Sequence, residues 1–292
     1  MPDTTFVRKL DEGVAWVYRS VRSRRSIELP NFVPRAFTNT IAAGIIATVL
    51  AGQAVPQRGP GDTEGSGRKP VLVELFTSEG CSSCPPADRF LERLDKSQPM
   101  PGIEIVAMSE HVDYWNHDGW VDPFSSADLT RRQQDYARRL NLPEVYTPQI
   151  VIDGFRQCVG SSEADAAALI RKAAEKPKLD LRMRDGARPG TVEIDVKGGS
   201  DGHGGGDVYI AFADDEAQSD VLSGENRGMK LHHIAIVRKL RKIGKLDKPA
   251  EFKREVPVSS FGRGRLIAFV QDPGSGAVTG VGLYRIESEP TK

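Results

Sequence analysis

Cysteine is scarce in this chain of 292 residues, which contains only Cys81, Cys84 and Cys158. Three unevenly spaced cysteines do not supply the paired cross-links of a disulfide-stapled scaffold, so the fold must depend on hydrophobic packing. The chain also lacks net charge, because 40 basic residues balance 40 acidic ones. Without a positive overall field, a nucleic-acid partner is not expected. The hydrophobic content of 39% is typical of a globular protein.

A long apolar run is also missing from the N-terminal region. The run IAAGIIATVLA at residues 41–51 is shorter than the roughly 20 residues that a membrane helix needs. A basic stretch precedes this run and small residues follow it, which predicts a secretory signal peptide or N-terminal anchor at residues 1–54. A membrane tether through residues 38–55 and a buried helix are the alternatives. Residues 55–70, rich in Pro, Gly and charge, are typical of a flexible linker.

Residues 71–176 alternate strand patterns with helix patterns. The apolar run VLVELF at residues 71–76 is typical of a strand that is buried on both faces of a sheet. Further strands are expected at residues 103–112 and 149–153, and helices at residues 85–96, 125–141 and 161–176. Alternating strands and helices predict an α/β sandwich.

Residues 177–288 contain short runs of β-forming residues separated by Gly, Asp and Pro. This spacing predicts a small β-sandwich-like domain at the C-terminus. Two arrangements fit the pattern: a separate β-rich domain, or strands that add to the sheet of residues 71–176.

The stretch TSEGCSSCPPAD at residues 77–88 places Cys81 between a buried strand and a helix. The N–H groups and dipole of a helix N-terminus favour a thiolate there, and Cys84 follows closely enough to resolve a mixed disulfide. We interpret the pair as a dithiol/disulfide redox centre; a metal site and a structural disulfide are the alternatives. Zinc requires four N or S ligands and no second CxxC is present, so we expect no metal and no cofactor.

Thr147-Pro148 directly precedes the strand pattern QIVID. Together with the CxxC, this dipeptide resembles the thioredoxin-like superfamily, in which a cis proline opens the third core strand and lies against the cysteines. The resemblance implies a thioredoxin-like sandwich at residues 71–176, with Thr147 and Pro148 on the substrate side. The strand VELF resembles the thioredoxin strand that carries a buried acid, which implies that Glu74 relays a proton for Cys84. A Glu74 that faces water is the alternative.

Four segments, in order, resemble an uncharacterised family of exported bacterial proteins with a thioredoxin-like domain. They are VELFTSEGCSSCPPADRFL, HVDYWNHDGWVDPF, YTPQIVIDG and GENRGMKLHHIAIVRKL. The resemblance implies fold and export but names no substrate. Cys158 and the long N-terminal region depart from the family pattern, and we expect Cys158 to pack as a small apolar side chain.

The segment HVDYWNHDGWVDPF follows the second strand, so it should lie at the same end of the sheet as the cysteines. Its aromatic residues fit either an apolar rim for a substrate or a packed loop, and within it Trp115 and His111 are candidate substrate-binding residues. Further on, His232 and His233 should point to opposite faces of a strand, which excludes binding of one metal by both.

These observations predict an exported thiol-disulfide oxidoreductase that is periplasmic or secreted. If residues 38–55 form a membrane tether, the protein would instead be anchored to the inner membrane. Cys81 would attack and Cys84 would resolve, with protein or small-molecule thiols as substrates and a redox partner in the envelope. A non-catalytic exported binding module with a thioredoxin-like core, and zinc or copper handling through the CxxC, are the alternatives.

Overall fold

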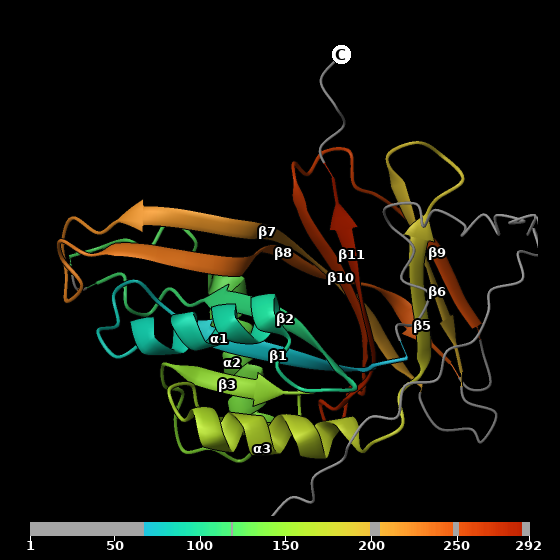
Figure 1. Ribbon diagram of the computed structural model, residues 1–292, viewed down its shortest axis with the longest axis horizontal. Helices are drawn as coiled ribbons and strands as arrows, with labels where there is room; N and C mark the ends of the chain where they lie inside the picture. The colour runs from blue at the N-terminus through green and yellow to red at the C-terminus, as the bar shows by residue number, and fades with distance from the viewer. Residues whose placement is uncertain (1–66, 118, 199–204, 248–250, 288–292) are drawn as a thin grey trace, which may run out of the picture. The chain divides into compact units, whose positions relative to one another are not determined.

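The computed structural model (Figure 1) describes residues 67–117, 119–198, 205–247 and 251–287. The predicted signal peptide or anchor at residues 1–54, the tether at residues 38–55 and most of the linker at residues 55–70 lie outside these ranges. Within the described part of the chain, no helix is both long and apolar enough to span a membrane.

The N-terminal half of the described chain has the expected mixture of strands and helices. Its strands are β1 (Lys69–Thr77), β2 (Ile103–His111), β3 (Gln149–Ile152) and β4 (Arg156–Val159). Its helices are α1 (Pro85–Ser97), α2 (Ala127–Arg139) and α3 (Glu163–Ala174). β1 pairs in parallel with β2 and antiparallel with β3, and β4 pairs antiparallel with β3. The four-residue β4 was not predicted, because so short and half-exposed a strand leaves no clear periodicity.

Among the described residues, seven strands follow α3. They are β5 (Asp180–Asp185), β6 (Thr191–Lys197), β7 (Gly206–Asp220), β8 (Lys230–Leu246), β9 (Glu251–Pro257), β10 (Gly264–Gln271) and β11 (Val278–Ile286). Four of them extend the first sheet, whose order is β11-β10-β7-β8-β2-β1-β3-β4, while β5, β6 and β9 form a second sheet of three strands. The described structure is therefore a mixed α/β fold with one large sheet and few helices.

The junction between the two halves is the pairing of β8 with β2. The two strands run parallel, and Ser109 of β2 pairs with Ile236 of β8. We expected residues 177–288 to form a β-rich domain with a small sandwich of its own. Instead, the boundary at residue 177 does not separate two sheets, and residues 56–292 form one compact unit. The arrangement in which later strands add to the first sheet is the one observed, because β8 lies beside β2 and brings β7, β10 and β11 with it.

Both faces of the large sheet are covered near β1, as the apolar run VLVELF predicts. Val71, Val73 and Leu75 pack on the face that α1 and α3 cover. Leu72 and Phe76 pack on the opposite face, with Leu129 and Tyr136 of α2. This alternation decides which helix any further β1 side chain meets.

The second sheet packs against the far end of the large one. Val192, Ile194 and Val196 of β6 share a buried apolar cluster with side chains of β7 and β10, such as Ile210 and Leu266. The sandwich-like packing of the C-terminal strands is thus a local feature of one body. The long β7–β8 hairpin leaves this sandwich and reaches over α1 (Figure 1).

Candidate functional site

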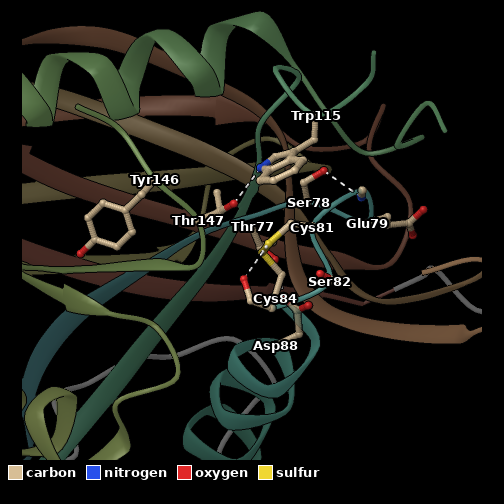
Figure 2. Close-up of a disulfide and its surroundings, with 12 residues drawn as sticks. Thr77, Ser78, Glu79, Cys81, Ser82, Cys84, Asp88, Trp115, Tyr146 and Thr147 are labelled. Atoms are coloured by element: carbon tan, nitrogen blue, oxygen red, sulfur yellow. Dashed lines mark hydrogen bonds between the residues drawn. A yellow bond between two sulfur atoms is a disulfide. The ribbon is translucent and has the colours of Figure 1, made fainter. Parts of the chain in front are cut away.

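The two cysteines of the CxxC are joined in a disulfide at the start of α1 (Figure 2). Cys84 is the N-cap of the helix, and its carbonyl accepts hydrogen bonds from the N–H groups of Ala87 and Asp88 at 2.8 and 3.1 Å. Pro85 occupies the first helical position, where a missing N–H has no cost. The predicted order of strand, CxxC and helix is confirmed.

The peptide bond between Thr147 and Pro148 is cis, as the resemblance implied. Trp115 connects this bond to the disulfide, because its Nε1 donates to Thr147 Oγ1 at 2.8 Å (Figure 2). Trp115 also lies against Gly80, where an added Cβ would be 3.0 Å from the Trp115 Cβ, so a larger residue beside Cys81 would crowd the tryptophan. Three of the predicted site positions, Trp115, Thr147 and Pro148, therefore lie around the cysteine pair.

Both cysteines are buried: Cys81 is 1% exposed and Cys84 is 0% exposed. The Sγ of Cys81 lies 3.4 Å from Ser83 Oγ. Because neither sulfur faces bulk water, an attacking thiolate reaches them only if the surrounding loops move.

The loop that carries Cys81 is held by the distant turn between β7 and β8. Asn226 Nδ2 donates to the carbonyl oxygens of Glu79 and Cys81 at 2.8 and 3.0 Å. The N–H of Ser82 donates to Glu225 Oε2 at 2.9 Å, and the hydrogen bonds from Ser82 lower the pKa of Glu225. Sequence reasoning assigned no role to Asn226 or Glu225; the only signal was that GENRGMK belonged to a resembling segment.

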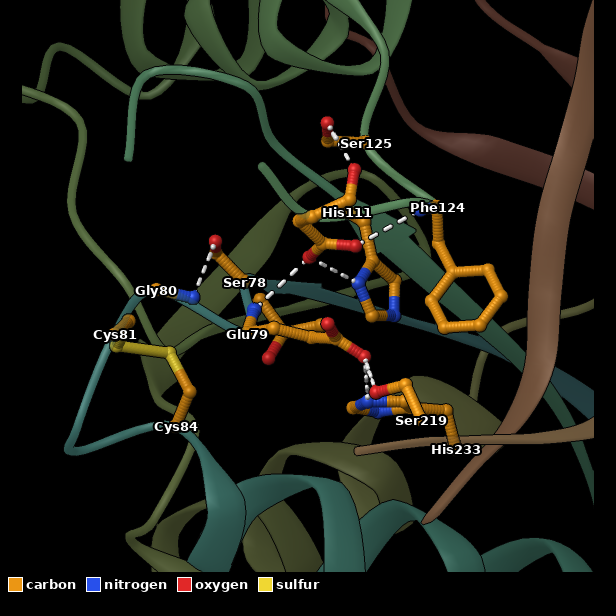
Figure 3. A network of polar contacts seen from close by, with 12 residues as sticks. Ser78, Glu79, Gly80, Cys81, Cys84, His111, Phe124, Ser125, Ser219 and His233 are labelled. Atoms are coloured by element: carbon orange, nitrogen blue, oxygen red, sulfur yellow. Dashed lines mark hydrogen bonds and ion pairs between the residues drawn. A yellow bond between two sulfur atoms is a disulfide. The ribbon is translucent and has the colours of Figure 1, made fainter. Parts of the chain in front are cut away.

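Glu79 is a fully buried carboxylate in this loop (Figure 3). Its carboxylate accepts hydrogen bonds from Trp120 Nε1 at 2.8 Å and from Ser219 Oγ. His233 Nε2 lies 3.2 Å from Glu79 Oε1. Sequence reasoning missed Glu79, because a glutamate in the turn TSEG looks like an ordinary solvent-facing residue.

His233 lies between two carboxylates. Its Nδ1 is 3.9 Å from Asp88 Oδ1, and Asp88 in turn accepts a hydrogen bond from Thr77 Oγ1 at 2.9 Å. Burial lowers the pKa of His233, but the neighbouring Asp88 and Glu79 outweigh it and raise the pKa from 6.5 to about 10. His233 is therefore an imidazolium at neutral pH.

His232 and His233 have different partners. His232 lies 3.4 Å from Glu92 and 3.5 Å from Glu216. Sequence reasoning did not find that His233 reaches the CxxC loop.

His111 does not occupy the predicted substrate-facing position. It is 0% exposed, and its Nδ1 lies 2.7 Å from Asp122 Oδ2. Its ring centroid is 4.6 Å from that of His233 (Figure 3). Burial raises the pKa of Asp122, but His111 and the N–H groups of Glu79 and Phe124 outweigh it, so the pKa is lowered. His111 is thus part of the support behind the loop and cannot contact a substrate without a rearrangement.

Glu74 also differs from its expected role. It is fully buried on the α2 face of β1, where Arg132 Nε donates to its Oε2 at 2.7 Å and Tyr136 Oη donates to its Oε1 at 2.7 Å. Because α1 and Asp88 lie on the opposite face, Glu74 is not placed as a proton relay for Cys84. It does not face water either, since β1 is a central strand. The physical reason is alternation: Leu75 points to α1, so its neighbour Glu74 points away.

The aromatic residues of the segment after β2 are packed rather than free. Tyr114 Oη donates to Gln133 Oε1 at 3.1 Å, and the Phe124 ring centroid lies 5.3 Å from that of His111. Cys158, on β4, is a free thiol whose pKa burial raises to about 11. Among the residues that the structure describes, no group of three or more His, Cys, Asp or Glu side chains is placed to hold a metal ion.

Residues 72–271 match the family model described as "Protein of unknown function (DUF1223)". This chain belongs to that family. A solved structure of a protein from Agrobacterium tumefaciens is similar, with a TM-score of 0.63 and 28% identity over 78% of this chain and 98% of that one. HBP35 of Porphyromonas gingivalis is similar with a TM-score of 0.50 and 16% identity, covering 78% of this chain and 80% of that one, which shows the fold alone. A comparison with curated proteins finds no match.

The four segments that resemble the family meet at the disulfide. The first carries the CxxC and Glu79, and the second carries Trp115, which contacts Thr147 of the third. The fourth carries Asn226, which binds the loop backbone. Segments that are separated in the chain therefore build one site.

Proposed function

We propose that this protein is a thiol-disulfide oxidoreductase with a thioredoxin-like core. The observation that carries the proposal is the Cys81–Cys84 disulfide at the N-terminus of α1, connected through Trp115 to the cis Thr147–Pro148 bond. A helix N-terminus stabilises a thiolate, and a second cysteine three residues away can resolve a mixed disulfide.

The exchange balances with a thiol as the electron donor. A substrate thiolate attacks Cys81 Sγ, the bond between the two cysteine sulfurs breaks, and its electron pair leaves on Cys84 Sγ. A second substrate thiol, as thiolate, attacks the substrate sulfur of the mixed disulfide and releases Cys81. The substrate becomes a disulfide, and the protein holds two electrons and two protons as a dithiol. The same steps in reverse reduce a substrate disulfide, and the reduction potentials of the two couples decide the direction.

The proposal includes export to the periplasm or the outside of the cell. The basic and apolar pattern of residues 1–54 supports it, and an oxidising compartment allows the disulfide to persist. In that setting the redox partner would be an envelope protein, and residues 38–55 would provide a tether if they stayed attached. Protein or small-molecule thiols are the proposed substrates.

The test compares the full chain with its Cys81→Ser and Cys158→Ser variants. We expect the unaltered protein to reduce insulin or to refold scrambled ribonuclease, Cys81→Ser to lose this turnover, and Cys158→Ser to retain it. Equilibration with glutathione and dithiothreitol buffers then gives the reduction potential. Equal turnover by the unaltered protein and by Cys81→Ser would refute the proposal.

A non-catalytic binding module is the second candidate, and the burial of both cysteines favours it. In that case the disulfide would only fix the loop. Val121 and Leu222 are 67% and 72% exposed, and the turns that carry them approach each other where Gly119 lies near Ser223. This module requires a disulfide that dithiothreitol cannot open in the folded protein, whereas the oxidoreductase requires one that opens without unfolding.

A further inference from the structure

Three charged side chains from three different elements meet behind the disulfide. Glu79 comes from the loop after β1, Asp88 from the first turn of α1 and His233 from β8; we call them the His233 cluster. Each of the three is at least nine-tenths buried. His233 Nε2 lies 3.2 Å from Glu79 Oε1, and its Nδ1 lies 3.9 Å from Asp88 Oδ1. The ring thus connects the loop that carries Cys81 with the helix that begins at Cys84.

Asp88 is the member of the cluster nearest to the helix start. Its N–H donates to the Cys84 carbonyl at 3.1 Å, so it lies one helical turn beyond Cys84. Figure 2 shows Asp88 below Cys84, on the side away from Trp115. The hydroxyl of Thr77 donates to Asp88 Oδ1 at 2.9 Å and fixes the carboxylate there.

Opening the disulfide creates a charge that this buried position must neutralise. When Cys81 is attacked, the electron pair of the broken bond stays on Cys84 Sγ, which is fully buried. A thiolate without water or a cation is unfavourable in such a site. A proton donor beside Cys84 would remove this charge, and the titratable groups of the His233 cluster lie on that side.

Several described side chains surround His233. Glu79 and Asp88 face its two ring nitrogens, and the His111 ring packs edge-on at a centroid distance of 4.6 Å. Asp122 holds His111 from behind at 2.7 Å, and the Phe124 ring closes the remaining side. The Nδ1 of His233 has no hydrogen-bond partner among the described residues, so its proton is directed towards Asp88 without being held by it.

We propose that His233 is a positioning residue of the redox centre that acts on Cys84 through Asp88. As the disulfide opens, a proton passes from His233 Nδ1 to Asp88, and from Asp88 to the Cys84 thiolate. His233 is left neutral beside Glu79 and regains a proton from water. The step rests on the proposed function, and its electron donor is the attacking thiolate. The imidazolium also offsets the two carboxylates, so it stabilises a nearby cysteine thiolate.

The raised pKa of His233, about 10, means that the ring carries its proton throughout the neutral range, so a proton is present on Nδ1 when the disulfide opens. The gap of 3.9 Å between Nδ1 and Asp88 must shorten by about 1 Å to form a hydrogen bond. Catalytic hydrogen bonds are often long in the resting state and shorten as charge develops.

The test compares three variants of the full chain: His233→Gln, Asp88→Asn and the control His232→Gln. The rate at which dithiothreitol opens the disulfide is followed against pH, and thiolate absorbance of the reduced protein gives the lower cysteine pKa. Removing the cation should raise that pKa by about one unit, and removing the Asp88 charge should lower it by about one unit. Both variants should slow opening about tenfold near neutral pH, since each interrupts the proton path. His232→Gln should match the unaltered protein.

Opposite pKa shifts with the same loss of rate are the decisive pattern, because a structural role would not reverse sign between the variants. Shifts of the cysteine pKa in the same direction in both variants, or unchanged pH profiles in both, overturn the inference.

If His233→Gln does not fold, Asp88→Asn alone decides: a lowered thiolate pKa with slower opening of the disulfide supports the proposal, and an unchanged pH profile refutes it. Dithiothreitol opening needs no natural substrate, so missing insulin turnover in the unaltered protein would refute only the oxidoreductase function. Normal turnover with an unchanged pH profile would refute only the role of His233.

Discussion

Two buried clusters flank β1 and its following loop, and each places two carboxyl groups around one cation. On the α2 face, Glu74 and Glu110 surround Arg132, which we call the Arg132 cluster. At the start of α1, the His233 cluster places Glu79 and Asp88 around a histidine. Arginine does not release its proton in proteins, whereas His233, with a pKa of about 10, holds its proton at neutral pH but remains titratable. The cation therefore decides which cluster can take part in proton transfer.

The Arg132 cluster has a fixed charge. Burial and the charge of Glu74 raise the pKa of Glu110 well above its usual value, and Arg132 only partly offsets this. Burial lowers the pKa of Arg132, but Glu74 outweighs it and raises the pKa above its usual value. Arg132 Nε lies 2.7 Å from Glu74 Oε2, so the pair is a buried ion pair that holds α2 on the sheet. A buried acid next to a CxxC strand is therefore not by itself evidence of a relay.

The largest expected effect comes from removing the fixed cation. Arg132→Met leaves the Glu74 carboxylate buried without its ion-pair partner, and we expect the free energy of unfolding in urea to fall by about 3 to 5 kcal/mol. Arg131→Met is the matched control, because Arg131 is an exposed neighbour that pairs only at the surface with Asp128, and its loss should cost well under 1 kcal/mol. The pH profile of disulfide opening should not change in either variant. A changed profile in Arg132→Met would remove the distinction between the two clusters.

Local sequence patterns were enough to predict the parts of the site that are local. A two-sided apolar strand and two prolines after Cys84 predicted the strand and the helix start, while the cis bond at Thr147-Pro148 was implied by the resemblance. Each of these depends on a few adjacent residues whose backbone preferences are strong. The placement of Trp115 followed from its position after β2, at the same end of the sheet.

The groups that hold the site depend on contacts that no local pattern reports. His233 and Asn226 reach the CxxC loop only because β8 lies next to β2, and the sequence offered no sign of this pairing. The face of Glu74 could not be decided either, because a strand that is apolar on both sides does not reveal which helix covers which side. His111 was a candidate substrate-binding residue, and its pairing with Asp122 could not be predicted because it requires the loop between them to fold back.

The second largest effect should be a pH dependence of stability that belongs to His233. Its pKa is about 10 in the folded protein and about 6.5 when exposed, so its contribution is complete below pH 6.5 and disappears as pH rises towards about 10. Between about pH 7 and about pH 9.5, the free energy of unfolding of the unaltered protein should therefore fall, relative to that of His233→Gln, by on the order of 2 to 3 kcal/mol. Urea unfolding with the disulfide intact measures this difference, with His232→Gln as control. A constant difference across this range would show that His233 is not a buried cation.

The smallest effect comes from a matched pair of hydroxyl deletions, one in each cluster. Tyr136→Phe removes the hydroxyl that donates to Glu74 at 2.7 Å, and Thr77→Val removes the one that donates to Asp88 at 2.9 Å. Each leaves a buried carboxylate with one donor fewer, which should cost about 1 to 2 kcal/mol in urea unfolding. Only Thr77→Val should also change the rate of disulfide opening, because it releases Asp88 from its position near Cys84, while Tyr136 acts on a cluster whose proton does not move. If Tyr136→Phe changed the opening rate as much as Thr77→Val, both faces of β1 would be coupled to the disulfide, and the kind of cation would not be what separates them.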